Sequence, residues 1–167
     1  MEMFYYSYYC GNMRQNYSQI GELMTSIDNE QDNFENPELE KQEQLARENH
    51  GDEKVDQRLE QLANLSMEDT LAMQEKAEAV HAEIAKSKDF ATDSAEMQKI
   101  VQQYLAYTTF ALSKLQGKSV VVDAEKFCNM ANSIANDADQ KAAFEQFGEG
   151  LAAHFSKAML YYAEQNL

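Results

Sequence analysis

The chain has 167 residues and a formal net charge of −15 at pH 7, with one proline and six glycines. This length predicts a single domain with a sizeable core, and the scarcity of helix-breaking residues favours long helices. A basic face is what holds a phosphate backbone, so the charge argues against direct nucleic-acid binding and against adsorption to an anionic membrane. Twelve acidic and four basic residues lie between Asp28 and Glu60, and we expect them to form a solvated helix face that keeps the protein soluble.

The chain carries no signal for secretion or membrane insertion. Cys10 and Cys128 are its two cysteines, and their separation fits neither a disulfide framework nor a metal-ligand spacing. The first ten residues are rich in tyrosine but lack the basic start and the aliphatic run of a secretory signal. No apolar stretch is long enough to cross a bilayer. We therefore expect a cytoplasmic protein.

Residues 1–35 are predicted to form an N-terminal arm that is partly helical or flexible. Helical spacing appears in this arm only at Ile20, Leu23, Met24 and Ile27. The first well-defined helix is expected to begin at Pro37, because asparagine before it is a good N-cap and proline suits the first helical position. It should run to about Glu48 and stop near Gly51, and a second helical segment is predicted from Lys54 to Asn64.

Two capping patterns predict the two longest helices. Ser66-Met-Glu-Asp69 opens one, whose apolar stripe is Met73, Ala77, Val80, His81 and Ile84. Asp93-Ser-Ala-Glu96 opens the other, which ends at Gly117 and repeats apolar residues every three or four positions. That stripe is Met97, Ile100, Val101, Tyr104, Thr108, Ala111, Leu112 and Leu115.

The last third of the chain predicts three shorter helices. Asp123 caps a helix that contains Phe127, Met130, Ala131 and Ile134, and Asn136-Asp137 ends it. A short helix through Phe144 and Phe147 follows, and Gly148 and Gly150 then lead into the final helix. The stripe of that final helix is Leu151, Phe155, Ala158, Met159 and Tyr162. Because Val120-Val121-Val122 is too short to anchor a sheet, the fold class is all-α, a bundle of five to six amphipathic helices.

One pattern suggests a metal site. Glu78-Ala-Val-His81 matches the Glu-x-x-His element of di-iron helical bundles, in which both ligands face inward one turn apart. Such a site needs a second element of this kind, and neither His50 nor His154 has a glutamate three residues before it. We interpret the pair as a chance occurrence, and we expect no enzyme activity, no metal and no cofactor.

An aromatic and methionine set on the later helices is the candidate ligand-binding site. Its members either fill the core or line a groove, where tyrosine supplies both apolar area and a hydrogen-bonding tip. The residues predicted to bind ligand are Tyr104, Tyr107, Phe110, Phe127, Cys128, Met130, Phe147 and Tyr161. For Cys128 two interpretations stay open, an inert buried thiol and a reactive thiol that faces the ligand.

The order of motifs resembles the TipAS antibiotic-recognition domain, the ligand-sensing module of some MerR-type transcription activators. The resemblance rests on Ala46-Arg-Glu-Asn-His-Gly51, the Ser66 box, Asp93-Ser94, Asp137 and Gly150-Leu-Ala. It spans about residues 34–165, so we assign residues 36–167 to the TipAS-like domain and 1–35 to the arm. The stretch from Gln19 to Asp28 resembles the end of the long MerR helix, and we expect no operator binding by this chain alone.

The resemblance implies a globin-like helical cup with a central ligand cleft. It also implies a function, which is to sense or sequester an amphiphilic antibiotic-like small molecule or a macrocyclic peptide, in transcription regulation or drug resistance. The acidic field should favour neutral or cationic ligands. The alternative is a protein-interaction or regulatory module that has lost ligand binding. We expect a monomer or a weak homodimer.

Overall fold

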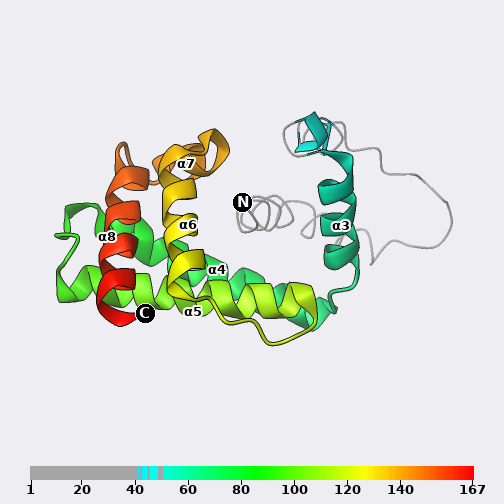
Figure 1. The fold of residues 1–167 in the computed structure, drawn as a ribbon, viewed down its shortest axis with the longest axis horizontal. Coiled ribbons are helices and arrows are strands. Elements are labelled where there is room, and N and C mark those ends of the chain that lie inside the picture. Colours follow the sequence, from blue (N-terminus) through cyan, green and yellow to red (C-terminus); the bar gives the residue numbers. More distant parts are fainter. Residues whose placement is uncertain (1–40, 42, 45, 49–50) are drawn as a thin grey trace, which may run out of the picture.

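The computed structural model describes residues 41, 43, 44, 46–48 and 51–167, and in this part of the chain the regular structure is entirely helical (Figure 1). The predicted all-α fold class is therefore confirmed. The expectations for the N-terminal arm and for the helix start at Pro37 lie outside the described residues. With the labels of Figure 1, the helices are α3 (Asp52–Ala63), α4 (Met67–Lys86), the short 3₁₀ helix η1 (Ser87–Asp89), α5 (Ala95–Gln116), α6 (Ala124–Asn136), α7 (Ala138–Glu145) and α8 (Leu151–Asn166).

Side-chain caps set the starts of the two long helices. The Ser66 hydroxyl accepts a hydrogen bond from the backbone N–H of Asp69 at 3.0 Å, so α4 begins where its capping pattern predicts. For α5 the cap is Ser94, which accepts from the N–H of Met97 at 3.2 Å. The capping pattern predicted a start at Asp93, which is wrong by one residue. Gly117 ends α5 in the left-handed conformation, with φ 62°, that glycine adopts without steric cost.

Aspartates organise the next two helices. Asp123 caps α6 by accepting from the N–H of Lys126 at 2.9 Å. Asp137 both ends α6 and caps α7, because its carboxylate accepts from the N–H groups of Asp139 and Gln140 at 3.2 and 3.1 Å. Both boundaries confirm the sequence prediction.

The predicted helix through Phe147 is too long, because α7 ends at Glu145. The N–H of Phe147 donates to the carbonyl of Phe144, and the N–H of Gly148 donates to the carbonyl of Glu145. These bonds span three residues, so the chain forms turns here instead of continuing the α-helix. The Glu145 carboxylate then accepts from the N–H groups of Gly150 and Ala152 at 2.5 and 3.3 Å. It supplies the N-terminal cap of α8 that the glycine before that helix lacks.

The helices form two layers. α4 and α5 pack side by side, and α6, α7 and α8 pack against one half of that pair, with α8 in contact with α5 and α6 (Figure 1). α3 contacts α5 and stands at the opposite end of the pair from α8 (Figure 1). The core lies between the layers, where the largest fully buried side chains are Phe127, Phe155, Met73, Ile84, Met97, Ile134, Leu151 and Met159.

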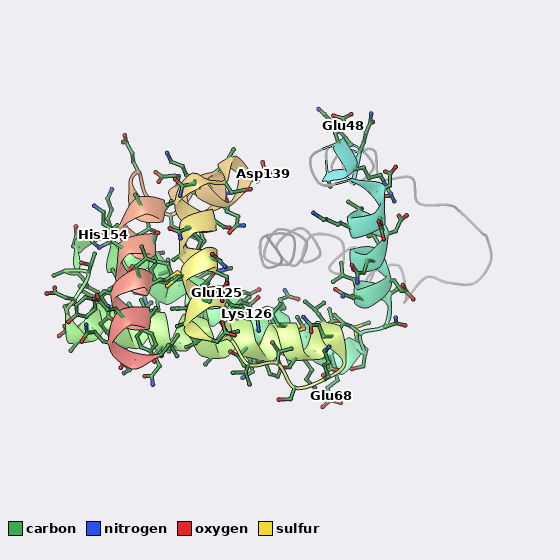
Figure 2. All side chains as sticks on the ribbon, in the orientation of Figure 1. Glu48, Glu68, Glu125, Lys126, Asp139 and His154 are labelled. Atoms are coloured by element: carbon green, nitrogen blue, oxygen red, sulfur yellow. The ribbon has the colours of Figure 1, made fainter. Side chains whose placement is uncertain are left out.

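Side-chain hydrogen bonds connect α8 to the segment between α4 and α5. The Nε2–H of His154 donates to the Phe90 carbonyl at 2.9 Å, and Figure 2 shows His154 on the α8 side of the molecule. The Gln98 side-chain amide donates to the carbonyls of Thr92 and Ala158, at 2.5 and 3.3 Å. These bonds fix the end of the two-layer body that is remote from α3. None of the described helices is long and apolar enough to cross a membrane.

Candidate functional site

Tyr104, one of the predicted ligand-binding residues, lies in the core between the two layers. Its ring stands edge-on to Phe155 at 5.3 Å between centroids and to Phe144 at 6.2 Å, while Phe144 and Phe155 stack at 5.6 Å. Only 4% of Tyr104 is exposed, and this burial raises the pKa of its phenol above the usual range. We call Tyr104, Phe144 and Phe155 the interior cluster, and its packing geometry is that of a structural core.

Phe127 also belongs to the core. Its side chain is fully buried on α6, and its ring meets Tyr162 of α8 edge-on at 6.1 Å. α6 and α8 are therefore joined through this pair, in the edge-to-face geometry that also joins α5 to α7 and α8 in the interior cluster.

A second aromatic group reaches the surface. The imidazole of His81, on α4, lies 6.4 Å from the Tyr107 ring of α5 and 5.7 Å from the Phe147 ring of the α7–α8 loop. Tyr107 is buried, whereas 41% of Phe147 is exposed. We call these three residues the His81 cluster. Partial burial lowers the pKa of His81, so the imidazole is neutral at pH 7 and the cluster is aromatic and uncharged there.

The loop that carries Phe147 is held on both sides. On one side, Gly148 packs against the Lys88 side chain of η1, where an added Cβ would come within 3.2 Å of Cδ. On the other side, Glu145 binds the first N–H groups of α8. The exposed ring is therefore fixed by its loop, which limits the ordering cost when a ligand packs against it.

Phe110 sits in a different setting, beside two lysines. Nζ of Lys76 lies 5.2 Å from the ring centroid, and Nζ of Lys114 lies at 5.7 Å. Lys114 also forms a 2.6 Å ion pair with Asp69, and this pairing lowers the pKa of that carboxyl. The ring is half-buried and is covered by cation–π contacts between α4 and α5.

The remaining predicted residues are spread over α6 and α8. Cys128 and Met130 are both half-buried, but residues two apart on a helix point to opposite flanks, so the two side chains do not face one ligand together. Cys128 is the fifth residue of α6, one turn beyond the N–H groups that a thiolate at the helix start would meet. Tyr161, on α8, is 39% exposed.

The structure thus joins Tyr107 and Phe147, and it does so through His81, which the sequence analysis did not place in the site. Its position on the edge of the α4 stripe was the only local signal. The Glu78–His81 pair is not part of a metal centre in the described region, where no group of three or more His, Cys, Asp or Glu side chains is placed to hold a metal ion.

The family described as the TipAS antibiotic-recognition domain matches residues 42–162, which include every helix from α3 to α7 and most of α8. No curated protein and no solved structure matched. The family is one of ligand-sensing domains and is not catalytic. Because the match covers well over half of the chain, this protein belongs to the TipAS antibiotic-recognition domain family.

Proposed function

We propose that this domain binds an amphiphilic antibiotic-like small molecule or a macrocyclic peptide, without catalysis, at the surface around the His81 cluster. The observation that carries the proposal is Phe147, which is 41% exposed and whose ring lies tilted against a neutral imidazole, in a family of ligand-sensing domains. In this account Tyr104 and Phe127 support the site from the core and do not touch the ligand.

The chemistry of the cluster suits a ligand with both apolar and polar parts. The exposed Phe147 ring offers apolar area, and the partly buried imidazole of His81 beside it carries polar atoms. The net charge of −15 favours neutral or cationic ligands over anionic ones. Binding would sense or sequester the molecule in the cytoplasm, with residues 36–167 as the ligand-binding domain. Covalent capture by Cys128 stays a prediction.

A thermal-shift screen tests the proposal. Purified protein is heated with macrocyclic peptide antibiotics, hydrophobic dyes and cationic drugs, and a true ligand raises the melting temperature in proportion to the logarithm of its excess over Kd. Tyr161→Ala and Phe147→Ala are screened beside the wild type, because the two rings are similarly exposed on different elements. Loss of the shift in Phe147→Ala alone supports the site. No shift with any compound at high concentration contradicts the proposal.

The alternative function is protein interaction without a small ligand. It predicts a dimer or a complex with another chain in light scattering, which depends on residues 1–35. If the protein remains a monomer with and without those residues, and a ligand is found, the alternative is excluded.

A further inference from the structure

The outer face of α4 differs from that of α6. On α6 the exposed positions one turn apart are all polar, namely Glu125, Asn129, Asn132 and Asn136. On α4 the corresponding face carries Met67 and Leu71, which are 58% and 56% exposed. Single exposed apolar residues are common, but two of this size spaced i and i+4 form a continuous apolar strip.

Acidic side chains lie on the same face as this strip. Glu68 lies three residues before Leu71, and Glu75 lies four residues after it. This spacing places all three residues on one side of the helix. The buried stripe of α4, formed by Met73, Ala77, Val80 and Ile84, points the other way. Within the described structure neither Glu68 nor Glu75 forms an ion pair or a hydrogen bond, so both carboxylates are available. Further along α4, the exposed side chains of Ala79 and Ala82 are small, so they do not project from this face.

We propose that this face of α4, defined by Met67, Glu68, Leu71 and Glu75, docks a basic amphipathic helix of a protein partner. The apolar pair would meet the apolar stripe of the partner, and the two carboxylates would meet its lysines or arginines. The strongly acidic chain attracts such a partner over a distance. The same charge disfavours a second copy of this chain as the occupant, because two copies would bring these carboxylates together.

The docking face is separate from the His81 cluster. Leu71 and His81 are ten residues apart, which is almost three helical turns. A partner helix on the first half of α4 therefore leaves the Phe147 ring accessible. The interaction is expected to be weak and transient, because one helix face buries less area than a stable interface needs.

The test uses a synthetic amphipathic helix of leucine and lysine, about five turns long, and measures its binding to the full chain by fluorescence anisotropy. The double variant Met67→Gln, Leu71→Gln keeps good helix formers on an exposed face and should weaken binding about tenfold or more. A scrambled peptide of the same composition, without an apolar face, should bind much more weakly than the ordered one.

Two charge variants distinguish the contribution of this face to binding from that of the overall negative charge. One double variant carries Glu68→Lys with Glu75→Lys, and the control carries Glu125→Lys with Asp139→Lys. Both change the net charge equally, but the control pair lies on α6 and α7, away from Glu68 (Figure 2). The first pair should weaken binding severalfold more than the second. Equal weakening by both pairs, or no effect of the glutamine variant, overturns the proposal. Concentration-dependent self-association of the wild type that the glutamine variant abolishes would also overturn it, in favour of a homodimer.

Discussion

The interior cluster and the His81 cluster are built from the same kinds of residue, yet they differ in what they leave for a ligand. In the interior cluster the Phe155 side chain is fully buried and the rings of three helices close on one another. In the His81 cluster a loop residue, Phe147, closes the group from outside and keeps 41% of its surface exposed. Aromatic content alone does not mark a binding site, because the element that carries the ring decides whether its face stays accessible.

The largest effect should come from the interior cluster. Phe155→Ala removes a ring that Tyr104 and Phe144 both contact, and the cavity should lower the free energy of unfolding by about 3–5 kcal/mol. Urea denaturation followed by circular dichroism measures this loss. Phe155→Leu, which keeps part of the volume, should lose clearly less. A loss below about 1 kcal/mol for the alanine variant would mean that the core is not packed as described.

A cap substitution should have a smaller effect. Ser94→Ala removes the hydroxyl that accepts from the N–H of Met97, and such a loss costs about 1 kcal/mol. Ser119→Ala, in the exposed segment after α5, is the matched control and should change stability little. Ser94→Asp should restore most of the loss, because aspartate also caps a helix. Equal stability of the two alanine variants would argue against Ser94 as the cap.

The surface cluster should tolerate the loss of its exposed ring. Phe147→Ala should lower the free energy of unfolding by about 0.5–1 kcal/mol, because the ring is only partly buried and its loop is held by other contacts. The same urea experiment compares it with Phe155→Ala. Similar losses for the two variants would remove the distinction between the interior and surface clusters.

The smallest effect is a pH dependence from His81. Burial lowers its pKa in the folded state below the ordinary value of 6.5, so the unfolded chain binds a proton first as the pH falls. The contribution of this histidine to stability is therefore complete above about pH 6.5 and decreases as the pH falls below it. Between pH 7 and 5.5 the stability of wild type should fall more steeply than that of His81→Gln. Parallel curves would contradict a buried neutral imidazole.

Local signals were enough to predict most helix ends from the sequence. Ser66, Asp123 and Asp137 cap their helices because a short polar side chain satisfies N–H groups two or three residues away. The prediction at Asp93 missed by one residue, because two good capping residues stand side by side and only the folded backbone selects Ser94.

The site could not be predicted in the same way. Tyr104 and Tyr107 are one turn apart on α5, and both lie on its buried side. Only the packing of the α7–α8 loop against α4 brings the exposed Phe147 ring onto His81, which in turn contacts Tyr107. That contact joins two residues that are far apart in the sequence. Phe147 itself was assigned to a helix, because the turns after Glu145 depend on hydrogen bonds that apolar spacing does not show.

A calorimetric titration tests the central claim, that ligand binds at the His81 cluster, most directly. A compound found by thermal shift is titrated into wild type, Phe147→Ala and Val121→Ala, whose side chain is 74% exposed in the segment before α6. We predict that Phe147→Ala weakens affinity about tenfold or more while Val121→Ala and wild type bind equally. Unchanged affinity in Phe147→Ala, with the same enthalpy as wild type, would contradict it.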